Sequence, residues 1–517
     1  MNPKKNRIKR LLKYHKWPGL IISFMLIYIA TSGILMNHRS LISGIDLNRN
    51  FLPKEYNYKN WNLAALKGNQ IISKDSILFY GNIGVWLTDS NMTDFTNFNE
   101  GFTKGIDNRK IFDIHLSANK NLYAATLFGL YNYNFKFNQW QKIPLDTEIE
   151  RFVSVLSKGD SVIAMNRSDV FIGLDEGVNT KFKKIQIKEP LAYINNVGLF
   201  ETMWQIHSGE VFGLPGKLFV DFIGLLIIIL SITGIIYFFF PKLIKRRKQK
   251  NKSVQKLINT NKWSLKWHNK IGAWFIVFLI ITTLTGIFLR PPLLLTIANT
   301  RIPVLKFTHL DQPNPWYDDL RDLIYDEDKD VFLLAGYNGL YELKTLKSTP
   351  KLFDSQPPIS VMGINVFEKY DDHVFLIGSF SGLFLWSPQR AVIYDFISGR
   401  PYQGSSNGSP FGSYAISGLI KDSNQNLYLA DYSIGIISGS DERSFVDMPE
   451  NILSDSPISL WNLCLEIHTG RIFHFLLSDF YILLVPISGI IALIVIISGY
   501  LLYRRKKINS SLRQAQG

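Results

Sequence analysis

Long apolar runs alternate with long segments of mixed polarity along this chain. Four runs are apolar over about 20 residues, the length that a helix needs to cross a bilayer. They predict membrane-spanning helices at residues 17–37, 218–240, 271–289 and 476–503. The first run is longer than the apolar core of a signal peptide and no small-residue cleavage site follows it, so we expect a retained anchor.

Between these helices the pattern changes to short β-rich runs joined by turns. Six such stretches occur, at residues 76–87, 121–133 and 161–174 in the first intervening segment and 331–343, 374–386 and 426–438 in the second. Their turn residues lie 40 to 53 positions apart within each segment and are Gly84, Gly129, Asp169, Gly339, Gly382 and Gly435. This spacing is close to one propeller blade, and Asn-Gly turns between aromatic and β-branched runs are typical of hairpins.

Three blades in each segment would leave open sheet edges, which promote aggregation. We therefore predict that both segments close together into one propeller-like domain of about six blades. The alternative is two separate small β domains.

The helices and their flanks repeat within the chain. Residues 14–33 align without a gap to residues 267–286, and residues 204–222 parallel residues 465–480 with three residues missing from the later copy. The fold class expected is therefore a membrane protein with a four-helix bundle built by internal duplication, carrying a β-rich exported domain made from two segments.

The positive charge lies beside the apolar runs. Residues 1–16, 241–270 and 504–517 hold 23 of the 57 Lys and Arg residues and no Asp or Glu, whereas the rest of the chain holds 34 basic and 42 acidic residues. This is the positive-inside pattern. It predicts that the basic leader 1–16, the loop 241–270 and the tail 504–517 are cytoplasmic and that segments 38–217 and 290–475 are exported. It also removes nucleic acid as an expected partner, since the lipid bilayer accounts for the charge.

Histidines recur at the ends of the predicted helices. His15 and His268 occupy equivalent positions at the cytoplasmic ends of the first and third helices, and His207 and His468 precede the second and fourth helices on the other side. Two imidazoles from facing helices are what a six-coordinate haem requires. A single histidine there could instead extend to the bilayer surface. Glycines that would let a macrocycle approach, or that serve ordinary helix packing, are Gly19, Gly33, Gly234, Gly272, Gly286 and Gly489.

Other candidate residues are less symmetric. His38 ends the first helix, while its counterpart is Pro291, so it is a substitute ligand or a hydrogen-bonding neighbour. The repeated Asp221 and Asp479 are either acceptors that orient a ligand imidazole or helix-start acids favoured by the dipole. The only cysteine, Cys464, excludes an intrachain disulfide and a cysteine-based metal site.

The histidine motifs, the Ser32-Gly33 end of the first repeat and the four-helix layout resemble the PepSY-associated transmembrane proteins, a family that includes inner-membrane siderophore reductases with b-type haems. The resemblance implies that His15, His207, His268 and His468 are axial ligands of haem b. A helix of about 20 residues spans about 30 Å, so two haems are expected, one held by His15 and His268 and the other by His207 and His468. The family often carries PepSY modules outside the membrane, where this chain carries blade-like repeats.

The leading hypothesis is a haem-dependent oxidoreductase of the bacterial inner membrane that passes electrons to a ferric, siderophore-type complex in the periplasm. No dinucleotide-binding fingerprint occurs in the cytoplasmic segments, so the electron donor is expected to be a quinol or a separate reductase. No catalytic residue is assigned. The alternatives are a membrane-anchored sensor or docking protein without redox activity, and a transporter, which four helices lacking polar mid-helix residues do not favour.

Overall fold

A computed structural model describes residues 3–191, 193–298, 300–360, 362–390, 392–403, 412–438 and 445–514. The chain divides into two compact units. Unit 1 comprises residues 1–42, 195–311 and 460–517, and unit 2 comprises residues 43–194 and 312–459. Each unit draws on both halves of the sequence, and the ends of the two predicted exported segments belong to unit 1.

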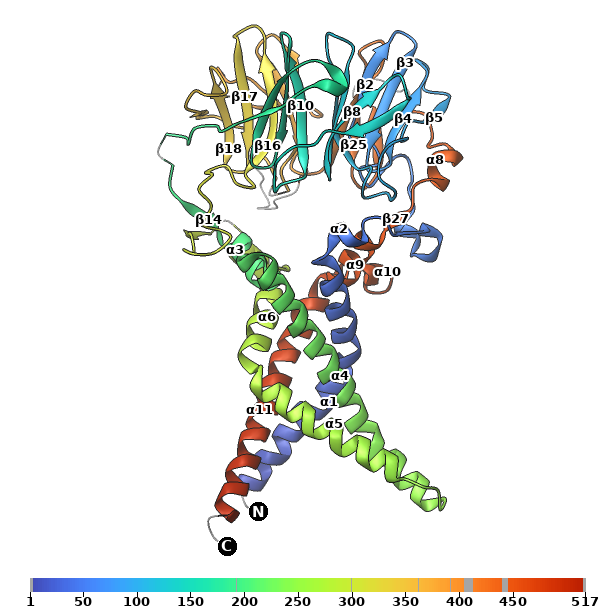
Figure 1. Ribbon diagram of the computed structural model, residues 1–517, viewed down its shortest axis with the longest axis vertical. Coiled ribbons are helices and arrows are strands. Elements are labelled where there is room, and N and C mark those ends of the chain that lie inside the picture. Colours follow the sequence, from blue (N-terminus) through green and yellow to red (C-terminus); the bar gives the residue numbers. More distant parts are fainter. Residues whose placement is uncertain are drawn as a thin grey trace. The chain divides into compact units, whose positions relative to one another are not determined.

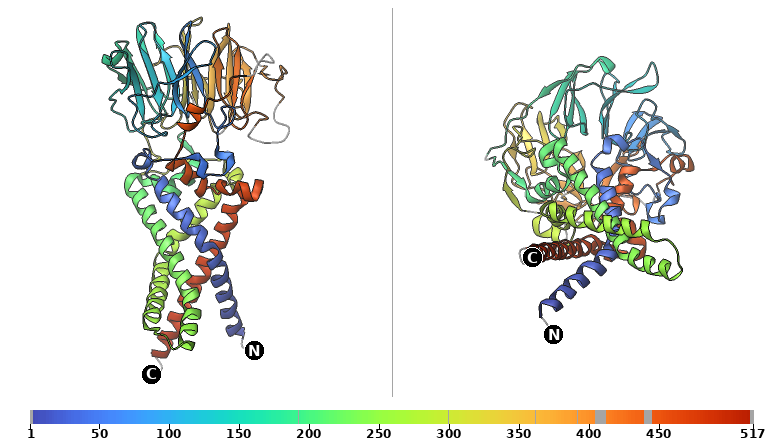
Figure 2. Two further views of the ribbon diagram at one scale, coloured as in Figure 1. Left: turned by 90° about the vertical axis from the view of Figure 1, so that its right-hand side faces the viewer. Right: turned by 60° about the horizontal axis from the view of Figure 1, so that its bottom comes forward.

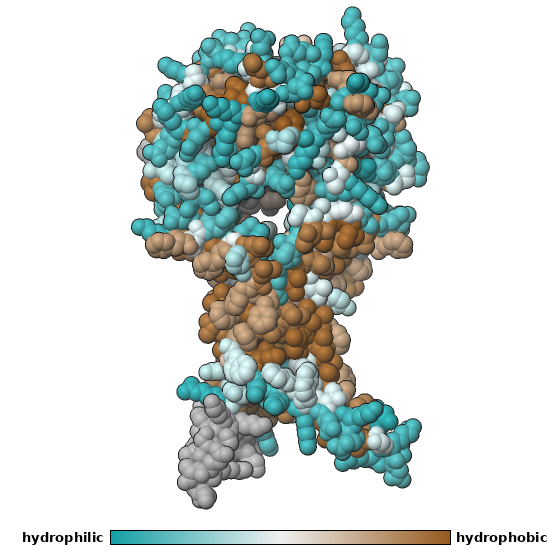
Figure 3. All heavy atoms as spheres, viewed as in Figure 1, coloured by the Kyte–Doolittle hydropathy of each residue, from teal (hydrophilic) through white to brown (hydrophobic). Residues whose placement is uncertain are grey.

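Unit 1 is built on long apolar helices (Figure 1). Three are long and apolar enough to cross a membrane, namely α1 (Pro3–Met36), α4 (Gly213–Gln249) and the segment Arg471–Arg505, which includes most of α11 (Leu484–Gln514). A fourth span exists if the bent pair α5 (Gln255–Trp274) and α6 (Ile276–Phe288) is counted as one. The chain is therefore a multi-pass membrane protein. Apolar residues dominate the visible surface of these helices (Figure 3), where Ile21 is 72% and Phe278 41% exposed.

Two predicted helices differ from the structure. The run 271–289 is not one straight helix, because α5 and α6 meet at an angle of 71° around Phe275. Gly272, a weak helix former, lies in the turn before the bend. The run 476–503 becomes one helix only from Leu484, because the chain first forms α10 (His474–Leu477) and a 3-10 turn at Ser478–Leu483.

Two short helices stand before the second and fourth spans. α3 (Leu199–Ser208) is followed by Gly209 and α9 (Leu460–His468) is closed by Gly470, and both glycines have left-handed backbones, with φ of 83° and 75°. A side chain at Gly209 would also meet the carbonyl of Gly216 at 2.2 Å. Glycine is the residue that ends a helix at such a position without strain. Each cap therefore fixes where the helix carrying His207 or His468 stops.

The helix contacts follow the duplication. α1 packs on α11 and α9, and correspondingly α5 packs on α4 and α6 packs on α3. α1 also packs on α4, and α11 packs on α6, which joins the two repeats (Figure 2). The remaining elements of unit 1 are α2 (Arg39–Ile42), α7 (Leu293–Ile297) and a two-stranded sheet of β14 (Asn196–Gly198) with β15 (Arg301–Pro303).

The described part of unit 2 contains six antiparallel sheets of three or four strands, each made from one continuous segment (Figure 1). The first three are β2 (Gly68–Ser73) to β5 (Phe95–Asn97), β6 (Ile111–Leu116) to β9 (Gln139–Lys142) and β10 (Phe152–Lys158) to β13 (Lys183–Ile185). The next three are β16 (Leu320–Asp326) to β19 (Lys351–Leu352), β20 (Ile364–Asp371) to β23 (Tyr394–Asp395) and β24 (Ile416–Lys421) to β26 (Gly435–Ser438).

Each of the six predicted hairpins is a pair of adjacent strands in one of these sheets. They are β3 (Ser76–Gly81) with β4 (Gly84–Thr88), β7 (Leu122–Thr126) with β8 (Gly129–Asn134), β11 (Ser161–Asn166) with β12 (Val170–Leu174), β17 (Val331–Gly336) with β18 (Gly339–Leu343), β21 (Val374–Ser379) with β22 (Gly382–Trp386) and β25 (Leu427–Asp431) with β26. Five turns use a glycine with positive φ. The turn before Asp169 instead uses the Asn166 side chain, which accepts hydrogen bonds from the amides of Ser168 and Asp169.

Neighbouring sheets are joined by apolar cores. The first strands contact one another in the order β2, β6, β10, β16, β20, β24 and again β2. Six apolar clusters lie between successive sheets, and one of them joins the last sheet to the first through Phe79, Trp86, Ile420 and Tyr428. The two segments of unit 2 therefore share their cores and are not two separate domains.

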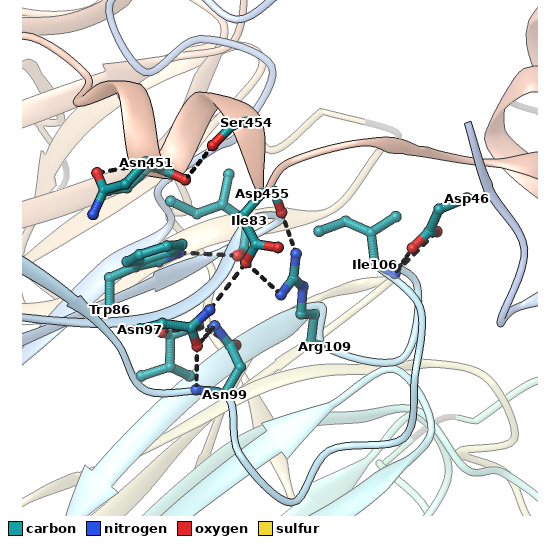
Figure 4. A network of polar contacts seen from close by, with 12 residues as sticks. Asp46, Ile83, Trp86, Asn97, Asn99, Ile106, Arg109, Asn451, Ser454 and Asp455 are labelled. Carbon is teal, nitrogen blue, oxygen red and sulfur yellow. Dashed lines mark hydrogen bonds and ion pairs between the residues drawn. The ribbon is translucent and has the colours of Figure 1, made fainter. Parts of the chain in front are cut away.

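The end of unit 2 is attached to its first two sheets by polar contacts (Figure 4). Asp455, which follows α8 (Glu450–Ser454), pairs with Arg109 at 2.9 Å and accepts a hydrogen bond from Asn97 at 3.0 Å. Asn451 donates to the carbonyl of Phe95 at 2.9 Å. Next to this network β27 (Ile458–Ser459) pairs with β1 (Asp46–Leu47). The first and last parts of unit 2 are thereby held to each other.

Acidic side chains face one another from the first strands of three sheets. Burial, with repulsion by Asp113, raises the pKa of Asp322 to about 7. Burial likewise raises the pKa of Asp113 to about 6, although the amide of Val155 donates to its carboxylate at 2.8 Å. Glu368 adds negative charge near both groups. Native unit 2 therefore holds protons that the unfolded chain releases near pH 4.

We expect unit 2 to lose stability as the pH rises from 5 to 8, because the native carboxyl of Asp322 must then ionise in a desolvated site. Asp322→Asn removes that cost, so the variant should unfold at a higher temperature than the natural protein at pH 8, and the difference should vanish near pH 5. Thermal unfolding of the detergent-solubilised protein, followed by β-sheet circular dichroism, measures this. Asp75→Asn, at an exposed position, is the control for the substitution itself. A variant less stable than the natural protein at pH 8 would contradict the assignment.

Candidate functional site

Four histidines of unit 1 meet in two pairs. His15 on α1 and His268 on α5 have ring centroids 5.9 Å apart and ring planes at 76°. His207 on α3 and His468 on α9 have ring centroids 6.0 Å apart and ring planes at 60°. Each pair takes one imidazole from each repeat. These are the same two pairs that the sequence predicts as ligand pairs.

Each imidazole is held through its Nδ1 atom by a backbone carbonyl of a neighbouring helix. The accepting carbonyls are those of Val495 for His15 at 2.9 Å, Leu230 for His268 at 3.1 Å, Thr282 for His207 at 3.0 Å and Ile29 for His468 at 2.9 Å. A carbonyl oxygen only accepts hydrogen bonds, so Nδ1 carries the hydrogen in all four rings. The Nε2 atom of each neutral ring keeps its lone pair for another partner.

The four carbonyls belong to one repeated local motif. Three residues after each carbonyl a Ser or Thr hydroxyl donates back to it, at 3.0 to 3.1 Å, and a glycine follows directly. The four steps are Ser32-Gly33, Thr233-Gly234, Thr285-Gly286 and Ser498-Gly499. Three of the hydroxyls also lie 3.0 to 3.3 Å from the Nδ1 atom. One helix turn therefore presents a carbonyl, a hydroxyl and a bare backbone to each imidazole.

The glycines make room for the rings. A Cβ atom would approach the Cε1 atom of the imidazole to 2.9 Å at Gly33, 2.8 Å at Gly286 and 2.7 Å at Gly499. At Gly234 the corresponding distance is 3.5 Å, an ordinary contact. An alanine at three of the four positions would thus displace the ring from its hydrogen bond.

Sequence reasoning identified part of this motif. Gly33, Gly234 and Gly286, which were predicted to leave room beside the histidines, lie against imidazoles. Gly489, predicted for the same reason, packs on Ile287 instead. Gly499 was missed, as were the contacts that the four hydroxyl residues make with the carbonyls and the imidazoles. The signal that could have found part of the motif is the Ser/Thr-Gly step, since Ser32-Gly33 and Thr285-Gly286 occupy equivalent positions of the repeats. Ser498-Gly499 lies farther along its helix than the repeat alignment of Thr233-Gly234 predicts, so the alignment does not point to it.

The aspartates and His38 lie elsewhere. The His38 Nε2 atom is 2.7 Å from a carboxylate oxygen of Asp221, and Asn37 donates to the other oxygen at 2.8 Å. Asp221 therefore orients His38 and not one of the four paired rings. The side chain of Asp479 is 95% exposed and lies 4.0 Å from His474. The geometry gives it no part in orienting the paired imidazoles.

The donor set limits what the pairs can hold. Among the described residues no group of three or more His, Cys, Asp or Glu side chains could bind a metal ion. Each imidazole pair offers two nitrogen ligands, so a metal between them must bring its other ligands with it. A macrocyclic metal complex such as haem does so.

A family model described as the PepSY-associated TM region matches residues 1–240 and again residues 241–506. The chain belongs to this family. The two matches coincide with the two repeats, so each copy of the PepSY-associated TM region supplies one imidazole to each pair.

Comparison with other proteins adds little. No curated protein matches the chain. Among solved structures, it is similar to the extracellular domain of a putative hybrid two-component system of B. thetaiotaomicron, with 12% identity over 75% of this chain and 40% of that chain and a TM-score of 0.34. It is also similar to the computationally designed protein Ika8, with 7% identity over 73% of this chain and 98% of that chain and a TM-score of 0.30. At such scores the likeness carries no argument about function.

We expect alanine at Gly33, Gly286 or Gly499 to destabilise unit 1 by about 1–3 kcal/mol, the usual cost of overpacking a tight contact. Gly234→Ala should cost less, because its added methyl group meets the ring at an ordinary distance. Thermal unfolding followed by helical circular dichroism measures the series. Gly272→Ala, whose nearest neighbour would be Leu230 at 3.8 Å, is the matched control. Equal effects at Gly272 and Gly286 would show that the rings do not require the glycines.

Proposed function

We propose that the chain binds two b-type haems, one between His15 and His268 and one between His207 and His468, and passes electrons across the membrane to a ferric complex. The observation that carries the proposal is the fourfold arrangement in which Nδ1 is fixed to a helix carbonyl and Nε2 is left available. A lone interfacial histidine needs no such contact. Four histidines that are held in the same way, and that pair between the two repeats, have the features of a ligand set.

The spacing of the rings fits this role. Imidazole nitrogen binds transition metals at about 2 Å, so two rings on opposite sides of one metal have centroids roughly 6 Å apart. The measured separations are 5.9 Å and 6.0 Å. The hydrogen bond from Nδ1 to a carbonyl would fix the tautomer and raise the basicity of Nε2, as outer partners of metal ligands do.

The two pairs lie at different depths of the helices. On α1, His15 is 17 residues from Ser32, which contacts His468, a distance of about 25 Å along a helix axis. One pair thus serves each end of the spanning helices. When bound, haem supplies reversible one-electron transfer at its iron. The chain's part is to hold and orient the imidazoles and to keep water from them.

Positive charge accompanies the second pair. The guanidinium of Arg290 lies close enough to His468 to act on it electrostatically. Arg471 lies near Arg290 but is itself paired with Glu466. Cations at this place would favour a cofactor that carries carboxylates. This supports placing haem at the second pair.

We further infer the topology and the shape of unit 2. The basic flanks favour cytoplasmic termini and a periplasmic unit 2 in the bacterial inner membrane. The closed order of first-strand contacts and the six shared cores support a six-bladed propeller. The substrate proposed is a ferric siderophore-type complex, because ferric iron bound by hard oxygen donors is released on reduction. A quinol or partner reductase would supply the electrons.

The test is the haem content and redox spectrum of the full-length protein, produced with added haem and purified in detergent. We expect about two haems per chain that dithionite reduces. Alanine at either member of one pair should remove about one haem, and the double variant His15→Ala with His268→Ala should remove no more than either single change. Combining His15→Ala with His207→Ala should remove both.

His373→Ala, in unit 2, is the matched control and should retain both haems. Absence of reducible haem from the natural protein would refute the proposal and leave the sensor or docking role of unit 2 as the alternative. Equal loss in the His373 variant would show that the four paired histidines have no special part.

A further inference from the structure

A cavity with a volume of about 490 Å³ lies in unit 2 between its second and third sheets. One wall comes from β8, β9 and the two residues after β9, and the other comes from η3 (Gly177–Asn179) and the residues that lead to β13. The lining consists of Asn132, residues 141–144 and residues 178–182. A second cavity of about 490 Å³ shares residues 142–144, so the hollow continues beyond β9. Ligand sites in proteins commonly have volumes in this range.

Asn132 gives this cavity a hydrogen-bond acceptor that has no donor. The residue is only 1% exposed, and its Nδ2 atom donates to the carbonyl of Leu122 at 3.2 Å. Because a carbonyl only accepts, this contact fixes which side-chain atom is the oxygen. That oxygen, Oδ1, accepts a hydrogen bond from no residue in the described part of the chain. Buried polar groups nearly always have a partner, so Asn132 indicates a donor that the described chain does not supply.

A second amide lies directly opposite Asn132. Gln141 on β9 pairs with Asn132 on β8, and side chains at such positions of antiparallel strands share one face and lie about 5 Å apart. An amide offers both donors and an acceptor. The Thr180 hydroxyl is already engaged, since it lies 2.8 Å from the hydroxyl of Tyr123 and accepts from the amide of Glu176 at 3.0 Å. The two amides are therefore the groups of the wall that suit a ligand with hydroxyls.

The charged residues of the lining, Lys142 and Lys181, are both exposed. Lys142 pairs with Glu150 at 3.1 Å. All the buried lining residues are uncharged. The half-buried ring of Phe182 packs against the apolar core between the two sheets. This combination favours a neutral ligand that has hydroxyls at its edges and C–H groups on its faces.

The backbone of β9 does not favour an extended peptide as the ligand. The amide of Trp140 already donates to the carbonyl of Glu100 at 2.8 Å. A peptide that adds a strand to a sheet edge needs such backbone groups to be free. Strand addition is therefore blocked at this residue, and recognition depends on the side chains of the cavity.

We propose that the cavity binds a neutral oligosaccharide. A sugar carries hydroxyls, which both donate and accept hydrogen bonds, and C–H faces, which pack on aromatic rings. One hydroxyl would donate to Oδ1 of Asn132, others would bond to Gln141, and a C–H face would lie on Phe182. The continuation of the hollow beyond β9 leaves room for more than one sugar unit. The site belongs to unit 2 alone, so it stands whether or not the histidine pairs bind haem.

Calorimetric titration of maltotriose, and separately of cellotriose, into the full-length protein tests the site. The protein is purified in a detergent without a sugar headgroup, because such a headgroup would compete. We expect saturable binding of at least one trisaccharide to one site per chain. Asn132→Leu and Gln141→Leu each leave a ligand hydroxyl without its partner, so each should weaken binding about fivefold or more. Since Gln141 is half-buried, its variant tests the site even if Asn132→Leu does not fold.

Gln139→Leu is the matched control. Gln139 lies on the same strand and the same face as Gln141, is likewise half-buried, and does not line the cavity. This variant should bind as the natural protein does, and trialanine, an extended peptide, should not bind. If neither trisaccharide binds, or if Gln139→Leu weakens binding as much as Gln141→Leu, the proposal is wrong. Binding of trialanine without binding of a trisaccharide would identify a peptide groove and would also overturn it.

Discussion

Unit 1 depends on one repeated contact, in which an imidazole lies against a glycine and donates its Nδ1 hydrogen to a helix carbonyl. The carbonyl is available because a Ser or Thr one turn later shares it, and the ring reaches it because the next residue has no side chain. A polar ring among apolar helices is costly unless its hydrogen bonds are satisfied. Here the protein satisfies Nδ1 of each ring, and Nε2 keeps its lone pair. The contact that stabilises the bundle therefore also leaves a nitrogen that the proposed cofactor could use.

The duplication turns this local contact into a pair of sites. Because His15 and His268 lie at equivalent positions of two repeats, packing the repeats together brings the two rings to a centroid separation of 5.9 Å, and that of His207 and His468 is 6.0 Å. On α1 the two candidate sites are separated by 17 residues, about half of that 34-residue helix. Short helices closed by Gly209 and Gly470 are what return the second pair of histidines to the bundle after each segment of unit 2.

Much of this arrangement could be predicted from the sequence, and the reasons for the failures are physical. Hydropathy identifies the spanning helices, because crossing a membrane requires long apolar runs. The gapless repeat identifies the ligand candidates, because it places histidines at equivalent positions of both copies. The bend at Phe275 was missed since nothing in the run 271–289 interrupts its hydropathy. Gly499 was missed because a glycine in a helix has many uses, and only the imidazole that lies against it shows which use applies.

The six hairpins of unit 2 were predicted from turn chemistry. The contacts from Asp455 to Arg109 and Asn97 were not, because they join residues more than 340 positions apart and leave no local pattern.

Electron paramagnetic resonance of the oxidised full-length protein tests the central claim most directly, because it reports the axial ligands and the angle between them. The ring planes within the pairs are inclined by 76° and 60°. We predict two low-spin ferric haem signals of the strongly anisotropic type that steeply inclined imidazole planes produce. One signal should be lost in a His15 variant and the other in a His207 variant. High-spin signals only, or a spectrum without ferric haem, would contradict the account.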